Sequence, residues 1–363
     1  MRFPEFSGEW EKCKFGDIAT GFDYGMNAAA KPFDGENKYI RITDIDEASS
    51  TYNDTDIVSP DGTLTDNYVV NDRDILLART GASTGKSYLY RKSDGKLYYA
   101  GFLIRANVTE HNPYFVFSQL HTHRYWRWVS IMSARSGQPG INSQEYSSFP
   151  IFTTSLQEEN KISTLLSLLD ERIATQNKII EKLQSLIKGL AAQLTQSGTP
   201  NIRLCDCLEC HSSTLQENCV SVTGSYPVYG ATGLIGYTNN YAYNGESILI
   251  VKDGSGVGSL SYVNDHFSVI GTLNYLTAKE NYSILYLYYA LMAFNFTPYI
   301  TGMAIPHIYF KDYGKAKLFY PSIEKRIRIA SLLHNIDQKL VAEQNLVISL
   351  SAQKSYLLRM LFI

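Results

Sequence analysis

The sequence predicts an α+β fold in which two mixed α/β domains with β-rich cores are separated by two long helices that form an antiparallel intramolecular coiled coil. Apolar residues follow a heptad spacing from Ser155 to Leu190, and the same spacing returns 167 positions later from Ser322 to Leu357. The length of 363 residues also exceeds that of a typical single domain. Two copies of one heptad helix in one chain can pair with each other, and a pseudo-twofold relation would make them antiparallel.

The predicted helix seams repeat position by position. The first seam consists of Ile162, Leu166, Leu169, Ile173, Gln176, Ile180, Leu183, Ile187 and Leu190. The second consists of Ile329, Leu333, Ile336, Leu340, Glu343, Val347, Leu350, Lys354 and Leu357. The polar residue in the middle of the first seam, Gln176, returns as Glu343. We predict that this pair fixes the register of the coiled coil, as single polar seam residues can.

The order of domain and helix therefore occurs twice. We expect a first domain at 1–152, a first helix at 153–196, a second domain at 197–319 and a second helix at 320–363. Within the first domain the pattern predicts one helix over Tyr114–Met132 and strands at Lys38–Ile42, Asp74–Ala78, Lys86–Arg91 and Leu97–Ile104. The order Ser155-Leu156-Gln157-Glu158 has the form of a capping box at the start of the first long helix.

Bulk composition excludes two classes of protein. The formal net charge of −2 does not indicate a strongly basic nucleic-acid binder, so any contact with DNA must be local or shared with a partner. No apolar run reaches the length of a membrane span, and the amino terminus lacks the apolar core of a signal peptide. We therefore expect a cytoplasmic protein without a membrane partner.

Four cysteines cluster around one histidine. Cys205, Cys207, Cys210 and Cys219 lie near His211, and these residue types are the ligands that zinc prefers. The equivalent place in the first domain holds no such ligands, so reduced buried thiols are the alternative interpretation. We assign no metal site.

A glycine-rich stretch, Gly81–Ser87, resembles a phosphate-binding loop. Thr80 stands where the first glycine of such a loop should be, and the second copy, Gly254–Ser259, has no lysine. A tight turn between two strands is the favoured interpretation, with Arg79 and Lys86 beside it. Exposed N–H groups and cations at such a turn suit a DNA backbone.

Two further stretches suit nucleic acid. His121, His123, Arg124, Arg127 and Arg135 alternate with Tyr125, Trp126 and Trp128. This pattern indicates either backbone contact with nucleic acid or an amphipathic helix with buried aromatic rings. The glycine- and tyrosine-rich stretch Tyr226–Tyr237 predicts a strand, a loop and a strand. We find no set of residues that predicts a catalytic site.

Taken in order, four features resemble the specificity subunit of a type I restriction-modification system. They are Arg2–Phe6 with Trp10 and Asp17, the segment Asp74–Ala82, the stretch Tyr226–Tyr237 with Asp253–Ser255, and the two repeated helices. The resemblance implies two target-recognition domains, each reading one half of a split, asymmetric target in double-stranded DNA. It implies that the helices set the half-site spacing and dock two methylation subunits, and that restriction subunits can join.

The resemblance also implies a chain that is not itself an enzyme and holds no cofactor, because S-adenosylmethionine and ATP belong to the partner subunits. On this basis the residues expected near DNA are Arg79, Ser83, Thr84, Lys86, Arg124, Arg127, Arg135, Tyr229, Lys252 and Ser255. Two alternatives stay open: a non-catalytic scaffold without DNA specificity, and an independent enzyme that binds a nucleotide through Gly81–Ser87. The motif Asn112–Phe115, which resembles part of an adenine methyltransferase motif, is interpreted as a helix start.

Overall fold

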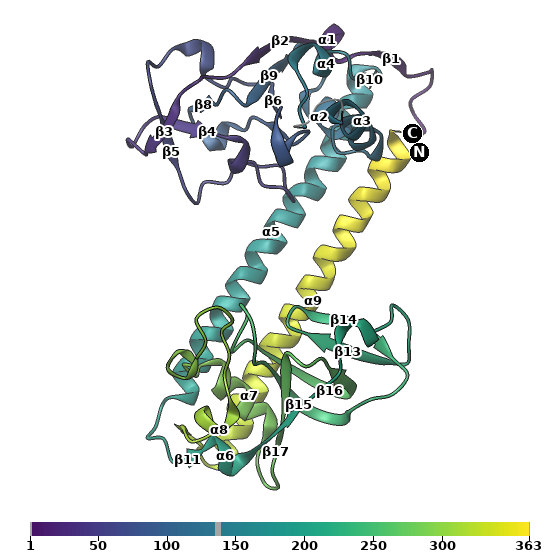
Figure 1. Ribbon diagram of the computed structural model, residues 1–363. Helices are drawn as coiled ribbons and strands as arrows, with labels where there is room; N and C mark the ends of the chain where they lie inside the picture. The colour runs from purple at the N-terminus through teal and green to yellow at the C-terminus, as the bar shows by residue number, and fades with distance from the viewer. Residues whose placement is uncertain (1, 135–138, 363) are drawn as a thin grey trace. The chain divides into compact units, whose positions relative to one another are not determined.

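The computed structural model describes residues 2–134 and 139–362, and they form two compact units (Figure 1). Unit 1 comprises Met1–Asn177 and Leu346–Ile363, and unit 2 comprises Lys178–Asn345. The boundaries between the units fall inside the two long helices, α5 (Leu156–Thr195) and α9 (Ile323–Leu361). Each unit therefore contains one globular domain and a segment of both helices, while the domain limits given above stay a prediction.

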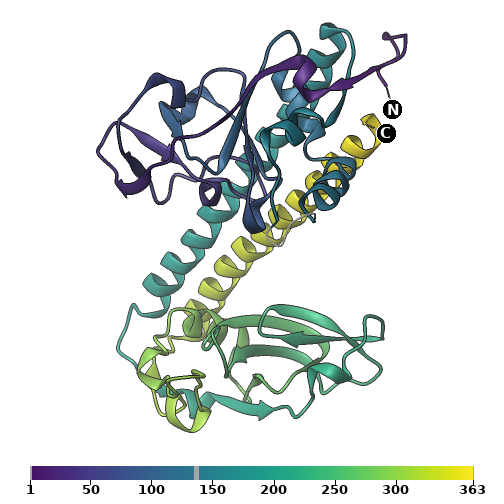
Figure 2. The same cartoon turned by 45° about the horizontal axis from the view of Figure 1, so that its top comes forward.

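In unit 1 the beginning of α5 packs against the end of α9. Ile162 and Leu166 share a buried cluster with Leu358, and the Lys354 Nζ lies 2.5 Å from Asp170 Oδ1. This pairing of an early α5 segment with a late α9 segment is antiparallel. The first and last described segments of the chain also meet in this unit (Figure 2), where the rings of Trp10 and Phe362 are 5.7 Å apart.

In unit 2 the end of α5 packs against the beginning of α9. Ile187 and Ala191 share a buried cluster with Ile329 and Leu333. The predicted antiparallel intramolecular pairing is thus confirmed within each unit. Gln176 is buried in unit 1, and in unit 2 Glu343 accepts a hydrogen bond of 2.7 Å from Lys339 Nζ. Their role in fixing the register stays a prediction.

One tyrosine ties each domain to its helices. In unit 1 Tyr114, on α2 (Pro113–Gln119), donates its hydroxyl hydrogen bond to the Asp170 carboxylate. In unit 2 Tyr289, on α7 (Ile284–Met292), donates to Asp337 at 2.7 Å. Asp170 and Asp337 occupy equivalent positions of the repeated helix, but Tyr114 is the second residue of α2 and Tyr289 the sixth of α7. The two units therefore make this bond with tyrosines at different helix positions.

Only half of the predicted capping box forms at the start of α5. Ser155 Oγ accepts a hydrogen bond of 3.3 Å from the Glu158 backbone N–H. The Glu158 carboxylate instead accepts hydrogen bonds from Arg2 at 2.6 Å and from the Thr154 hydroxyl at 2.7 Å. A buried carboxylate gains more from a cation than from a backbone donor, which explains the difference.

The main sheet of unit 1 has four antiparallel strands. Their order is β2 (Ala19–Tyr24), β9 (Leu103–Val108), β6 (Asp74–Ala78) and β7 (Ser87–Leu89). Three further strand pairs surround it: β1 (Glu11–Lys14) with β10 (Pro150–Thr153), β3 (Ala29–Pro32) with β5 (Val58–Asp61), and β4 (Lys38–Ile40) with β8 (Leu97–Tyr99). The remaining helices are α1 (Phe15–Ile18), α3 (His123–Ser133) and α4 (Ser143–Ser147).

Two predicted strands of unit 1 are shorter than expected, at Lys38–Ile40 and Ser87–Leu89, and two other predicted elements are each divided. The strand expected over Leu97–Ile104 is two strands, β8 and β9, because the chain turns at Ala100–Phe102. The single helix expected over Tyr114–Met132 is also two helices, α2 and α3. The second helix restarts at Thr122, whose hydroxyl accepts a hydrogen bond of 3.3 Å from the Tyr125 N–H.

Unit 2 is built on a six-stranded sheet. Its order is β12 (Leu208–Ser212), β17 (Leu273–Ala278), β15 (Tyr243–Val251), β16 (Leu260–Val269), β13 (Tyr226–Gly230) and β14 (Gly233–Thr238). The last two strands confirm the strand, loop and strand predicted over Tyr226–Tyr237. Outside the sheet, β11 (Ile202–Arg203) pairs with β18 (Lys317–Leu318), and the short helices are α6 (Leu204–Cys207) and α8 (Phe310–Tyr313).

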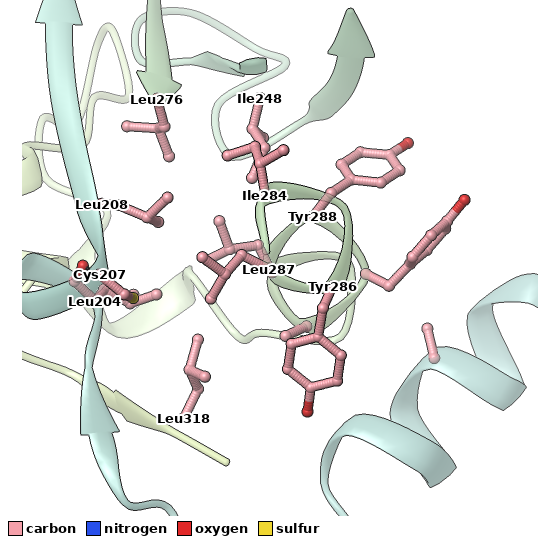
Figure 3. Packing of buried hydrophobic residues seen from close by; sticks show 14 of the residues in the cluster. Leu204, Cys207, Leu208, Ile248, Leu276, Ile284, Tyr286, Leu287, Tyr288 and Leu318 are labelled. Carbon is pink, nitrogen blue, oxygen red and sulfur yellow. Dashed lines mark hydrogen bonds between the residues drawn. The ribbon is translucent and has the colours of Figure 1, made fainter. Parts of the chain in front are cut away.

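The core of unit 2 lies between this sheet and α7. Ile248 and Leu276 of the sheet point towards Ile284 and Leu287 of the helix (Figure 3). All four side chains are buried. This packing fixes the sheet, and with it the turn that follows β15.

Candidate nucleic-acid interface

The glycine-rich stretch of unit 1 is a tight turn between β6 and β7. The Ala78 N–H donates to Lys86 O at 2.8 Å, and the Gly85 N–H donates to Ala78 O at 3.0 Å. Gly81 and Gly85 have φ values of +68° and +93°, which glycine adopts readily. A strand follows the turn, whereas a phosphate-binding loop is followed by a helix. The stretch thus has the geometry of the favoured interpretation, a tight turn between two strands, and lacks the helix that follows a phosphate-binding loop.

Unit 2 contains the same turn, 173 positions later. The Val251 N–H donates to Ser259 O at 3.0 Å, and the Gly258 N–H donates to Val251 O at 2.8 Å. Val251, Ser259 and Gly258 thus take the bonding roles of Ala78, Lys86 and Gly85 in unit 1. The duplication seen in the sequence thus extends to individual backbone hydrogen bonds.

The backbone N–H groups of the turn in unit 1 are largely used within the protein. Gly81 donates to Pro139 O at 3.0 Å, Thr84 to Gly81 O at 3.1 Å, and Lys86 to Ser83 O at 3.0 Å. Few N–H groups of this turn therefore remain for a phosphate, and side chains are the more available donors here.

Arg79 and Lys86 lie on either side of the turn. The Arg79 Nε donates to Gly101 O at 3.1 Å, and its guanidinium carbon lies 4.8 Å from the Tyr24 ring and 5.9 Å from the Phe102 ring. The Lys86 Nζ is 3.2 Å from Glu47 Oε2. Tyr24 and Phe102 were not predicted from the sequence, because β2 and the turn before β9 come beside Arg79 only in the folded sheet.

The two hydroxyl groups predicted at this turn differ in accessibility. Thr84 is buried, and its hydroxyl donates to Gly81 O at 2.8 Å. Ser83 is only partly buried. Because the Thr84 hydroxyl is buried and bonded inside the turn, Thr84 is not among the DNA contacts proposed below.

The basic and aromatic cluster of α3 divides into buried and exposed members. Arg124 lies with its guanidinium 4.4 Å from the Phe152 ring and donates to Gln119 Oε1 at 3.2 Å, and burial lowers its pKa. Tyr125 is buried, whereas Arg127 is exposed. Arg135 lies outside the described residues. Tyr125 thus follows the amphipathic-helix alternative, whereas Arg124 packs on an aromatic ring. Arg127 is exposed, as are His123 and Trp126.

In unit 2 the predicted residues lie on and near the equivalent turn. Ser255 is exposed at its tip. The Lys252 Nζ lies 2.5 Å from Asp253 Oδ2. Tyr229 of β13 is half-buried against Phe267, with ring centroids 6.4 Å apart. Lys252 and Ser255 are thus brought together, while Tyr229 lies on another strand.

An apolar loop beside this turn was not predicted. Met303 is fully exposed and the Ile305 side chain is 65% exposed. The loop is bonded to the turn, since the Gly254 N–H donates to Pro306 O at 2.8 Å. The only sequence signal was the repeat of Arg135-Ser136-Gly137 as Ile300-Thr301-Gly302, a correspondence in sequence that does not predict exposure.

A family model described as the type I restriction modification DNA specificity domain matches residues 7–185 and 202–350. The chain belongs to this family. The resemblance recognised in the sequence is thereby confirmed, and the two matched segments correspond to the two copies of the duplication.

Named relatives match over part of their length. The chain is 29% identical over 112 residues to the "Type I restriction enzyme EcoprrI specificity subunit" of Escherichia coli, covering 31% of this chain and 28% of that protein. It is 30% identical over 133 residues to the "Putative type I specificity subunit S.MpnORF285P" of Mycoplasma pneumoniae, covering 34% and 42%. These matches therefore span less than half of the relatives' length.

Solved structures share the fold of this type I specificity family member. The crystal structure of a type I restriction-modification system S subunit from M. genitalium matches with a TM-score of 0.69 at 17% identity, covering 96% of this chain and 95% of that chain. A chain from a structural study of complex assembly and conformational transition of the type I R-M system matches with a TM-score of 0.52 at 15% identity, covering 96% of each. The predicted fold class is confirmed.

The cysteine cluster of this specificity-family chain does not converge on one point. Over 2–134 and 139–362 no group of three or more His, Cys, Asp or Glu side chains is arranged to hold a metal. Burial raises the pKa of Cys207 to about 12 and that of Cys210 to about 11. His211 instead stacks on Tyr275 at 4.7 Å and shares a hydrogen bond of 2.9 Å with the Thr277 hydroxyl. Likewise, no helix in the described part of the chain is long and apolar enough to cross a membrane.

His121 of unit 1 is expected to make stability depend on pH. Burial, reinforced by the charge of Lys354, lowers its pKa to about 4, whereas the unfolded value is about 6.5. Between these pH values the unfolded chain binds a proton at His121 that the folded chain excludes. The contribution of the neutral imidazole to the free energy of unfolding is therefore fully present above pH 6.5 and is lost as the pH is lowered. We expect a loss of about 1–2 kcal/mol between pH 6.5 and 5. Chemical denaturation across this range measures it.

The control for this prediction is His121→Gln, which keeps a polar side chain but removes the titration. Its free energy of unfolding should be lower at neutral pH, because the imidazole bonds to Phe117 O and Ser50 Oγ, both at 2.9 Å, are altered. Its decline between pH 6.5 and 5 should be shallower than that of the parent. Equal slopes would contradict the assignment of the titration to His121.

Proposed function

We propose that this chain is the DNA-specificity subunit of a type I restriction-modification complex. Each unit reads one half of a bipartite, asymmetric target in double-stranded DNA. The observation that supports this most is the repeated turn. It is built with the same hydrogen bonds in both units, with Arg79 and Lys86 beside it in one and the exposed Ser255 at its tip in the other. Two similar scaffolds with different side chains suit the reading of two different half-sites.

We propose further that α5 and α9 set the gap between the half-sites and dock the methylation subunits. A helix of 40 residues, the length of α5, is ~60 Å long, and a rigid element of this kind suits a spacer. Several apolar side chains on the two helices are left in solvent, among them Leu168, Ile327 and Ile348. Exposed apolar residues on helices of this length favour a protein partner.

In the proposed complex this chain is not itself a catalyst. Two methylation subunits supply S-adenosylmethionine chemistry, restriction subunits supply ATP-driven cleavage, and the specificity subunit itself holds no cofactor. A chain with a net charge of −2 can bind DNA in such a complex, because the partner subunits add cations to the few basic residues at the turns. The competing enzyme hypothesis is tested by titrating the purified chain alone with ATP and with S-adenosylmethionine. Saturable binding of either would count against the proposal.

The proposed function is tested by mapping methylated adenines in DNA from cells that carry this chain with its methylation partner. The expected result is one motif made of two defined half-sites separated by an unspecified gap. Cells that carry the partner alone are the control, and they should lack the motif. A contiguous motif, or no motif that depends on this chain, would refute the proposal.

Lys86 gives a prediction about DNA affinity. Its ammonium contributes positive charge at the turn of unit 1 and is partly neutralised by Glu47. Replacement of Lys86 by Ala should weaken binding of the assembled complex to all sequences alike and reduce the slope of log K against log salt by about one. The opposite change, Glu47→Gln, should strengthen binding modestly. If neither variant alters the salt slope, Lys86 does not contact the DNA backbone.

A further inference from the structure

We infer that Arg79 is the residue with which unit 1 reads a guanine base, and that Lys252, its counterpart in unit 2, makes no equivalent contact. This inference rests on the proposed function and adds to it a specific base, a specific side chain and a difference between the two units. It follows from how the two side chains are held, what neutralises them and what surrounds them.

The Arg79 guanidinium is held in place from three directions. Its Nε donates to Gly101 O, while the rings of Tyr24 and Phe102 lie at 4.8 and 5.9 Å from its central carbon. A guanidinium has five N–H groups in one plane. With Nε used internally, the four N–H groups on the two terminal nitrogens remain. They form a planar donor pair whose orientation is set before a ligand arrives.

The charge of Arg79 is not neutralised in the part of the chain that the structure describes. No carboxylate oxygen of a described residue lies within ion-pair distance of it, although Arg41 is 2.8 Å from Asp44 and Arg105 is 3.2 Å from Asp23 in the same unit. Arg79 is also partly withdrawn from solvent. A partly buried cation with unused donors is well suited to an acceptor supplied by a ligand.

The surroundings of Arg79 favour a planar acceptor over a phosphate. It lines a hollow of about 580 Å³ whose walls include Met26, Tyr39 and the rings of Tyr24 and Phe102. These two rings are 44% and 56% exposed, so they present flat apolar surfaces beside the guanidinium. Guanine offers O6 and N7 as two acceptors in one plane, which match a bidentate arginine better than any other base edge.

The equivalent position in unit 2 has none of these properties. The backbone alignment is secure, because Arg79 N donates to Phe102 O at 3.0 Å and Lys252 N donates to Thr272 O at 2.9 Å. Lys252 carries an ammonium group, which cannot donate in the planar fork of a guanidinium, and Asp253 neutralises it at 2.5 Å. Thr272 stands where Phe102 provides a ring. The same scaffold thus carries a base reader in unit 1 and an internally paired lysine in unit 2.

The test uses the complex assembled with its methylation subunits and the motif mapped for the parent chain. Each guanine of the motif is replaced in turn by 7-deazaguanine, which lacks the N7 acceptor, in a synthetic duplex. We expect one replacement, in one half-site only, to weaken binding of the parent complex by about 5- to 150-fold. That penalty should disappear in an Arg79→Gln complex, whose methylation motif should also accept other bases at that position while the second half-site is unchanged.

Lys252→Gln is the matched variant. It should relax no base position in either half-site. The inference is overturned if Arg79→Gln weakens all duplexes equally, which would indicate a phosphate contact, or if it leaves every base preference intact, which would indicate a purely structural arginine. It is also overturned if no guanine replacement affects the parent complex, a measurement that does not depend on the folding of any variant. Absence of a bipartite motif for the parent chain would instead refute the proposed function.

Discussion

Replacement of Tyr146 by Phe is expected to destabilise the protein, whereas the same replacement at Tyr313 is expected to leave stability unchanged or to raise it. The two tyrosines are equivalent, 167 positions apart, and both are buried. The Tyr146 hydroxyl donates to Ala78 O at 2.6 Å and accepts from the Gly85 N–H at 3.2 Å. The Tyr313 hydroxyl is buried without a hydrogen-bond partner among the described residues.

The opposite outcomes follow from the cost of leaving polar groups unpaired. Tyr146→Phe removes a buried bond to the turn of unit 1 and should cost about 1–3 kcal/mol. Tyr313→Phe removes a buried hydroxyl that has no partner and should gain up to about 1–2 kcal/mol. Chemical denaturation of the three purified chains measures both. A substantial loss of stability in Tyr313→Phe would contradict this account of the second unit.

A larger loss is expected for Gly85→Ala. The residue has a φ of +93°, and an added Cβ would lie 2.8 Å from Val129 Cγ1 and 2.9 Å from Trp126 Cζ3. A left-handed conformation costs an alanine about 1–2 kcal/mol, and overpacking adds about 1–3 kcal/mol. We expect a loss of about 2–5 kcal/mol from the free energy of unfolding, together with loss of DNA binding, because the turn that carries Arg79 and Lys86 must shift.

Gly81→Ala is the control for this prediction. Gly81 also has a positive φ, +68°, but a Cβ there would meet no atom within 4 Å. Only the conformational cost of about 1–2 kcal/mol should appear. Equal losses of stability in the two variants would show that the contact between the added Cβ and α3 costs nothing, which would contradict this account of Gly85.

The parts of the fold that the sequence predicted best are those with a repeating local signal. The heptad seams predicted both long helices and their pairing, because the periodic spacing of apolar residues indicates which helix face is buried. The strand Asp74–Ala78 was predicted to the residue. The breaks at Ala100–Phe102 and at Leu120–Thr122 were not, because single residues such as Gly101 and Thr122 also occur inside strands and helices. The first break depends on a contact with a distant segment, since the Gly101 N–H donates to Met26 O at 2.8 Å, and at the second the Thr122 side chain caps α3.

The candidate site was predicted only in outline. Arg79 and Lys86 were placed correctly beside a tight turn, since glycine spacing and the duplicate turn are visible in the sequence. The sequence did not predict that backbone N–H groups of the turn are hydrogen-bonded within the protein. One acceptor, Pro139 O, bonds to the Gly81 N–H from 58 residues away. Nor could the sequence pair Arg79 with Tyr24 and Phe102, which reach it from β2 and the loop before β9.

The central claim is that one helix pair holds two DNA readers at a set separation. It is tested most directly by inserting seven residues, one heptad, between Asn177 and Lys178 of α5 and another seven between Asn345 and Leu346 of α9. The insertion keeps the apolar seam in phase while it lengthens both helices. Mapping of methylated adenines should then show both half-sites unchanged and a longer gap between them. An unchanged gap, or altered half-sites, would contradict the claim.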